Sequence, residues 1–171
     1  MNDTGSTDSD GIPTHSIAAI VEGGDVLQIG QALYYKKAPG IRTYGTTGVS
    51  FTEDDVTHTV YFSRPTNLAL DVKLEIMPLT GFNENVVLPL LRSALAEYLV
   101  TLRTGESLTV PRLYGVCYAI APELASTFMV TYITAQAGNY ARTSQQLAIG
   151  WREKLTLEDP ETQITFEVIE E

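Results

Sequence analysis

The fold is decided by one stretch of the chain, Thr59–Pro78, which reads TVYFSRPTNLALDVKLEIMP. From Leu68 to Ile76, branched apolar side chains alternate with the other residues of this stretch. An alternation with a period of two is typical of a β-strand that has one face in the core. A slip of one residue would turn every apolar side chain outward, so the register of this strand is strongly specified. The sequence therefore predicts a central strand that helices cover on its apolar face.

The helices that cover this strand are predicted from the residues that follow it. Between residues 84 and 102, apolar side chains recur at helical spacing. The helix is predicted over residues 84–102, with a start near Leu88 as the alternative, because Pro89 is tolerated only in the first turn of a helix. Another helix is expected to start at Pro111, with Cys117 on its apolar face.

Strand and helix signals also alternate before the central strand. Residues 16–21 are expected to form a short strand, and Gly23-Gly24 a turn. Asp25 is expected to cap the next helix, because Gln28 follows it at the spacing of a capping box. The Gly-x-Gly-x-x-Gly and Gly-Lys-Ser/Thr patterns are both missing, so the glycine pair is interpreted as a strand-to-helix turn and not as a phosphate-binding loop.

Residues 43–51 and 57–62 are expected to pair as a hairpin. Both segments are rich in β-branched and aromatic residues, and the acidic residues 53–55 between them suit the turn. Calcium loops alternate their acidic ligands and carry a glycine in mid-loop, unlike these adjacent carboxylates. A solvated hairpin turn is therefore the preferred interpretation.

The last third of the chain is predicted to add three strands. Residues 126–135 are expected to form a strand with Phe128 and Tyr132 on the same face. Residues 147–157 and 162–169 are expected to form a closing hairpin.

Together these signals predict an α+β protein of two small lobes, with mixed or antiparallel sheets that are each covered by one or two helices. Residues 1–11 contain no large apolar residue after the initiator and are interpreted as a flexible tail. The first lobe is expected to cover residues 12–78 and the second lobe residues 79–171. At 171 residues the chain is long enough to bury a sizeable core.

The composition argues against two classes of partner. The chain carries 11 basic and 21 acidic residues, which gives a formal net charge of −10. Its nearest approach to a basic cluster is Lys36-Lys37 with Arg42, so a nucleic acid would have to bind against net repulsion. No apolar run approaches the ~18 residues that a membrane span needs, and no signal peptide is recognised. Neither nucleic acid nor membrane is therefore an expected partner.

Residues suited to catalysis or metal binding are sparse. Cys117 is the only cysteine and is expected to be a buried thiol, and His15 and His58 are the only histidines. A cysteine nucleophile needs a base within hydrogen-bond reach, which nothing in the sequence specifies. No metal-ligand spacing is present. The sequence therefore favours a non-enzymatic assembly or binding module with no cofactor and no metal.

Separated segments of the chain resemble the baseplate J-like family of contractile phage tails, in particular its Mu-type members. Residues 21–47 carry a glycine-acid turn, a helix and a PGIRTYG segment, and residues 60–66 end a strand pair in F-x-R-P. Residues 153–168 also look like the closing hairpin of the family. The residues at the motif positions are Gly23, Gly24, Asp25, Pro39, Gly40, Thr43, Tyr44, Gly45, Phe62, Arg64 and Pro65.

The resemblance implies a non-enzymatic component of the baseplate wedge, which joins its neighbours into a ring around the tail hub and rearranges when the sheath contracts. The implied partners are other wedge and hub proteins. Association of the chain with copies of itself in a ring is a further partner arrangement that the resemblance allows. The implied location is the virion tail baseplate, assembled in the bacterial cytoplasm. The chain resembles the carboxy-terminal portion of such proteins, which are usually much longer.

Three residues are candidates for partner contact or for fixing the junction between the lobes: Tyr44, Arg64 and Pro65. Pro65 holds Arg64 extended, and Tyr44 lies between Thr43 and Gly45. The simpler alternative is that Arg64 pairs with a nearby acid and that Tyr44 packs over its loop.

A function from a different class is also compatible with the sequence. A cytoplasmic regulatory domain that binds a small ligand or a peptide would have a deep pocket lined by tyrosines. A flat surface would count against that function.

Overall fold

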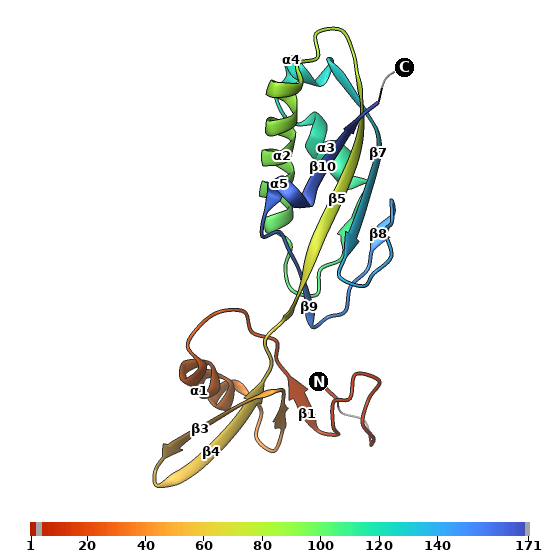
Figure 1. Cartoon of the computed structure of the whole chain (residues 1–171). Helices are drawn as coiled ribbons and strands as arrows, with labels where there is room; N and C mark the ends of the chain where they lie inside the picture. The colour runs from red at the N-terminus through yellow and green to blue at the C-terminus, as the bar shows by residue number, and fades with distance from the viewer. Residues whose placement is uncertain (3–4, 170–171) are drawn as a thin grey trace. The chain divides into compact units, whose positions relative to one another are not determined.

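The computed structural model describes residues 1–2 and 5–169, which divide into two compact units (Figure 1). The first unit covers residues 1–65 and the second residues 66–171. Helices and small mixed or antiparallel sheets build these units, which confirms the α+β class. The predicted boundary after residue 78 is corrected, because residues 66–78 form a strand whose partner strands all belong to the second unit.

The described part of the first unit consists of one helix and two pairs of strands. Its elements are β1 (Ser16–Ala18), α1 (Val26–Lys36), β2 (Arg42–Tyr44), β3 (Thr47–Glu53) and β4 (Val56–Phe62). β1 pairs in parallel with β2, and β3 pairs with β4 as the predicted antiparallel hairpin. Helix α1 lies so close to β3 that a Cβ on Gly30 would come within 2.9 Å of the Val49 side chain. The helix therefore needs a glycine at this contact.

Local signals set the ends of these elements. The Asp25 carboxylate caps α1 by accepting the backbone N–H of Gln28 at 2.9 Å, as predicted. The hairpin closes through Asp54 and Asp55, whose φ values are both positive, 49° and 61°. Two such residues between paired strands are typical of a type I′ turn. These adjacent acidic residues therefore shape a tight turn.

The described part of the predicted flexible tail folds back on β1. Asn2 pairs with Ser16 through backbone hydrogen bonds, and its side-chain amide donates to the carbonyl oxygen of Ile12 at 2.7 Å. The Asp8 carboxylate accepts the backbone N–H of Ile12 at 2.8 Å. Residues 3 and 4 of the predicted tail lie outside the described residues. Polar side chains thus order a segment that has little apolar surface to bury.

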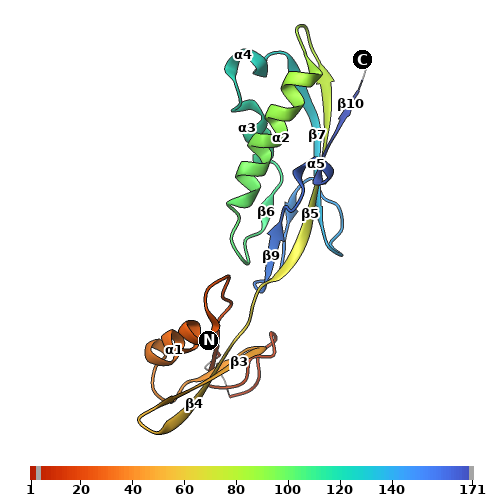
Figure 2. The same cartoon turned by 60° about the vertical axis from the view of Figure 1, so that its left-hand side comes forward.

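The second unit is built around the predicted central strand. Its elements are β5 (Thr66–Pro78), α2 (Glu84–Val100), β6 (Leu108–Thr109), α3 (Arg112–Tyr118), α4 (Pro122–Ala125), β7 (Phe128–Ala137), β8 (Gln146–Leu147), β9 (Glu153–Thr156), α5 (Pro160–Gln163) and β10 (Ile164–Val168). Helices α2 and α3 lie on one face of the sheet that contains β10, β5 and β7 in that order (Figure 2). This layering of a helix over the central strand agrees with the prediction.

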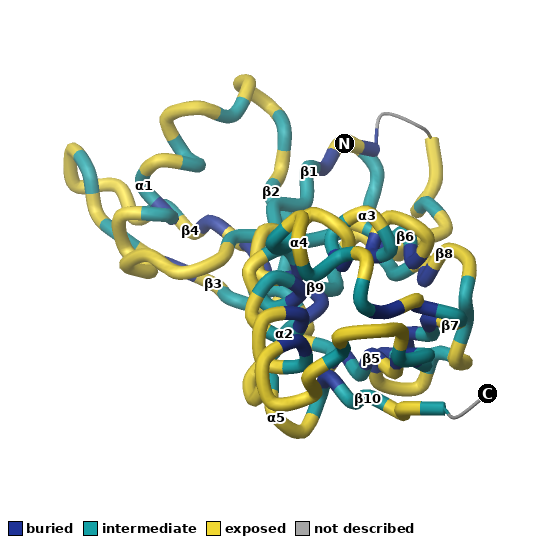
Figure 3. Tube along the Cα trace, turned by 90° about the horizontal axis from the view of Figure 1, so that it is seen from above, coloured by how far each residue is buried: buried dark blue, intermediate teal, exposed yellow. Residues whose placement is uncertain are grey.

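The core of the second unit forms between β5, β7 and α2, where the buried positions gather (Figure 3). The buried side chains of β5 and α2 are among those predicted from their periodicities: Leu70, Val72, Leu74 and Ile76 on the strand, and Val87, Leu91, Leu95 and Leu99 on the helix. The predicted Leu68, Leu88 and Tyr98 are only partly buried against this core. Burial of apolar side chains of this size contributes about 1.5–3 kcal/mol each.

Helix α2 begins at Glu84, as the helical spacing predicted, and not at the alternative start near Leu88. The Asn83 side chain caps the helix by accepting the backbone N–H of Asn85 at 3.1 Å, so Pro89 lies in the helix interior and not in its first turn. Proline has no N–H to donate to the carbonyl group four residues earlier, which belongs to Asn85. Pro89 and Asn85 are both exposed, so water can satisfy that carbonyl group.

Strand β7 departs from its predicted face because of a β-bulge. Val130 pairs with Ile76 and Tyr132 pairs with Glu75, which leaves Thr131 without an opposing residue. One extra residue reverses the alternation of the side chains. Tyr132 is therefore 46% exposed, whereas Phe128 is buried. The other buried side chains of β7 are Val130 before the bulge, and Ile133, Ala135 and Ala137 after it.

The predicted closing hairpin is wrong. β9 pairs in parallel with residues 66–69 of β5, and β10 pairs in parallel with residues 72–76 of the same strand. The short helix α5 lies between β9 and β10 in the chain. Alternation alone predicts two strands here, but it does not say which strand each of them joins.

Candidate functional site

Motif residues of the first unit meet at Arg64, which follows β4. Its guanidinium group donates hydrogen bonds to the carbonyl oxygens of Val21 at 3.1 Å and Gly24 at 3.0 Å, and also to that of Gly23. The same group lies over the Phe62 ring, 5.2 Å from its centroid. We call Arg64 and the three carbonyl groups the Arg64 clamp.

The loop held by the Arg64 clamp joins β1 to α1. Gly23 and Gly24 have φ values of 63° and 76°, in the left-handed region that glycine adopts without strain. Asp25 follows them and caps α1. A guanidinium can satisfy several acceptors at once, because its donors form a rigid planar fork. The clamp therefore ties the start of α1 to the end of β4.

A second set of contacts joins β2 and the residue that follows it to β4. The Thr43 hydroxyl oxygen accepts the backbone N–H of Tyr61 at 2.8 Å. Gly45 lies so close to Phe62 that a Cβ would overlap the Phe62 carbonyl group. Only glycine fits at that approach. The two motif segments, which are distant in the sequence, thus form one packed arrangement.

The three predicted contact residues have different surroundings. Arg64 belongs to the clamp, and among the described residues it forms no ion pair with the nearby acid that the simpler alternative expected. Pro65 is the last residue of the first unit. Tyr44 is half-buried in β2 and pairs with Ala18 of β1. The structure therefore brings only Arg64, of these three, into the clamp.

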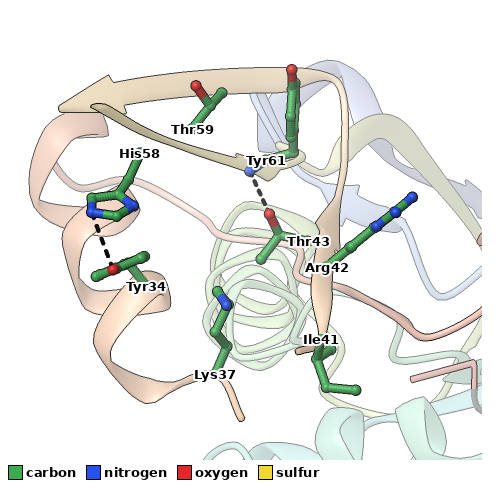
Figure 4. A pocket seen from close by; sticks show the side chains of 8 residues that line it. All are labelled: Tyr34, Lys37, Ile41, Arg42, Thr43, His58, Thr59 and Tyr61. Carbon is green, nitrogen blue, oxygen red and sulfur yellow. Dashed lines mark hydrogen bonds between the residues drawn. The ribbon is translucent and has the colours of Figure 1, made fainter. Parts of the chain in front are cut away.

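A hollow of about 330 Å³ lies between α1, β2 and β4 of the first unit (Figure 4). It is lined by Tyr34, Lys37, Ile41, Arg42, Thr43, His58, Thr59 and Tyr61. Sequence reasoning missed this hollow, because its residues come from three segments that only the fold brings together. The basic residues Lys36, Lys37 and Arg42 were the one signal that pointed toward it.

The walls of the hollow combine aromatic, hydroxyl and basic groups. The Tyr34 hydroxyl lies 3.2 Å from Nε2 of His58, and the two rings are 4.4 Å apart at their centroids. The Lys37 ammonium group is 5.7 Å from the Tyr34 ring centroid and points into the hollow in Figure 4. The Arg42 side chain extends away from it in that view. Within residues 1–2 and 5–169, neither Lys37 nor Arg42 forms an ion pair.

Cys117, the only cysteine, is buried in the core of the second unit. Burial raises the pKa of the Cys117 thiol to about 12, so the thiol stays protonated at neutral pH. No group of three His, Cys, Asp or Glu side chains among the described residues is arranged to hold a metal ion. None of the helices that the structure describes is both long and apolar enough to cross a membrane.

Comparison with known proteins leaves the family unassigned. No protein family model matches the chain, and no curated protein matches it. The function is therefore proposed from the residues and their geometry.

Proposed function

We propose that the chain is a non-enzymatic assembly component of a contractile phage tail baseplate. The observation that carries this proposal is that two of the segments resembling the baseplate J-like family meet in the Arg64 clamp. Arg64 reaches Gly24 across 40 residues of sequence. The motif residues have structural tasks there, since Gly23 and Gly24 form the turn and Gly45 permits close packing. Such motifs maintain a shape, which is what an assembly module has to preserve.

A baseplate component also needs surfaces for its neighbours. β10 stands at the edge of its sheet in the described residues, so it can accept an extended strand from a partner. The net charge of −10 favours a neighbour with a basic surface. Other wedge and hub proteins are the proposed partners, with self-association in a ring included, and the virion baseplate is the proposed location.

The location of the chain in tail-like particles tests this proposal. Particles from cells that carry the gene would be analysed by mass spectrometry and labelled with an antibody against the chain. We expect the label at the baseplate end of the tail, and no assembled baseplate when the gene is deleted. Complementation with Arg64→Ala should restore fewer particles than complementation with Arg112→Ala, which removes an exposed guanidinium outside the clamp. Intact tails assembled without the chain would reject the proposal.

The second candidate function is a cytoplasmic regulatory domain that binds a small ligand or a peptide. The hollow favours it, because Tyr34 and Tyr61 are among its lining residues. Its volume of about 330 Å³ lies at the lower end of the range of small-molecule sites, roughly 300–1,000 Å³. If intact tails form without the chain, this candidate takes first place.

A further inference from the structure

We propose that the hollow of the first unit binds a carboxylate group, with Lys37 as its charged partner. The inference stands on the hollow itself, which also favours the second candidate function, and it adds the chemical class of the ligand, which neither proposed function names. Its ligand is a carboxylate on a short apolar or aromatic stem, carried by an acidic side chain of a partner protein or by a small free acid.

The charge of the hollow is opposite to that of its surroundings. Residues 1–65 contain four basic and eight acidic residues, yet Lys37 and Arg42 line the hollow and no carboxylate does. Of these two basic residues, Lys37 points its charged group into the hollow (Figure 4). Lys37 is half-buried and forms no ion pair with a described residue. A partly desolvated ammonium without a carboxylate partner attracts an anion more strongly than one in bulk water.

Hydrogen-bond donors stand beside this charge. The Tyr34 hydroxyl can donate to Nε2 of His58, which places the ring proton on Nδ1. In Figure 4 the second ring nitrogen of His58 faces the hollow, on the same side as the Lys37 ammonium group. Lys37 and His58 can therefore each donate to one carboxylate oxygen.

The walls favour a single negative charge over several. The hollow lies at the carboxyl end of α1, where Lys37 is the C-cap and the last carbonyl groups of the helix place partial negative charge. Phosphate sites typically use the opposite end of a helix, where backbone N–H groups point at the ligand. Ile41 and the Tyr61 ring add apolar surface for a stem. This combination suits a monoanion with an apolar stem better than it suits a phosphate.

The test is an NMR titration of the full isotope-labelled chain, followed at the backbone amides of Thr43, Thr59 and Tyr61. The probes are 3-phenylpropanoate, its neutral amide 3-phenylpropanamide, inorganic phosphate, and the capped peptide acetyl-Gly-Glu-Gly-amide. The variants are Lys37→Gln and, as the matched control, Lys36→Gln. Lys36 is the adjacent residue with the same charge, but it does not line the hollow.

We expect saturable shifts at the hollow with the carboxylates, and binding about tenfold weaker for the neutral amide, because a hydrogen bond to a charged group is lost. Lys37→Gln should weaken carboxylate binding about tenfold for the same reason, and Lys36→Gln by less than about twofold. Tighter binding of the peptide would indicate a protein partner as the source, and tighter binding of 3-phenylpropanoate a free acid. Equal losses in the two lysine variants, preferred binding of phosphate, or shifts only outside the hollow would each overturn the proposal.

Discussion

The Arg64 guanidinium donates hydrogen bonds to three backbone carbonyl groups, and it is the side chain that supplies all the donors of the clamp. We expect Arg64→Ala to lower the free energy of unfolding of the first unit by about 2 kcal/mol, since hydrogen bonds to charged groups are worth more than neutral ones. Arg64→Lys should recover only part of this loss, because an ammonium group keeps the positive charge but lacks the planar fork of donors. Amide hydrogen exchange of the α1 residues measures the effect.

Arg112→Ala is the matched control for this prediction. It also removes one guanidinium, but Arg112 is exposed and belongs to the second unit. Exchange rates in α1 should stay at their wild-type values in this variant. If both variants protected α1 equally well, the clamp would not be what holds the start of that helix.

The Cys117 thiol links the stability of the second unit to alkaline pH. Burial raises its pKa from 9.0 to about 12, so the unfolded chain releases this proton at lower pH than the folded chain does. The contribution of this thiol is fully present below about pH 9 and is lost as the pH rises toward 12. We expect the free energy of unfolding of the second unit to fall with a steeper slope in the wild type than in Cys117→Ala.

Urea unfolding followed by the fluorescence of Trp151, at several pH values from 8 upward, would measure the two slopes. The hydrogen bond to Glu153 is the main cause that raises the pKa of Tyr140, which also titrates in the alkaline range. Since Tyr140 is present in both proteins, only the difference between their slopes reports on Cys117. Parallel slopes would show that the thiol is not buried in the folded unit.

Single elements were predictable where a local pattern fixes them. The alternation in β5 predicted its buried face, and the carboxylate of Asp25 caps α1 as its spacing indicated. The alternative start of α2 near Leu88 was wrong, because Asn83 provides a cap before Pro89. An exposed proline in the helix interior leaves only a water-accessible carbonyl group unpaired. Local rules thus predict an element well, but they give its ends less reliably.

Pairings between distant elements were not predictable from local patterns. β9 and β10 alternate as strands should, yet both join β5 instead of each other. The bulge at Thr131 depends on the register with β5, and nothing in the sequence of β7 marks it. The Arg64 clamp and the hollow have the same origin, because each is assembled from segments that meet only in the folded unit.

The turn of the β3–β4 hairpin holds Asp54 and Asp55 at positive φ values, a backbone conformation that is unfavourable for residues with a Cβ. The second position of a type I′ turn strongly favours glycine. We expect Asp55→Gly to raise the free energy of unfolding of the first unit by about 0.5–1 kcal/mol, because relief of the left-handed strain outweighs the added freedom of the unfolded chain. Thermal unfolding followed by circular dichroism measures this gain.

Asp55→Ala is the control for the hairpin prediction. It removes the same negative charge but keeps a Cβ at a position whose φ is 61°. A gain of equal size in the alanine variant would assign the effect to charge repulsion with Asp54 and Glu53, and not to the backbone of the turn.

At the scale of the whole molecule, the two units differ in how much apolar surface they bury. The buried apolar side chains described in the first unit are Ile12, Val49, Val60 and Phe62. The second unit has a continuous core that joins its strands to α2 and α3. Polar links such as the Arg64 clamp therefore carry a larger share of the stability in the first unit.

This difference predicts that residues 66–171 fold without the rest of the chain. Because β5 belongs wholly to the second unit, a fragment that starts at Thr66 keeps every strand pairing of its core. We expect this fragment to unfold cooperatively in urea, with a midpoint close to that of the second unit in the full chain, as measured by Trp151 fluorescence. Leu74 is 0% exposed, so Leu74→Ala should lower the free energy of unfolding by about 3 kcal/mol in the fragment and in the full chain alike. A fragment without a cooperative transition would show that the second unit needs residues before Thr66 and that the boundary lies elsewhere.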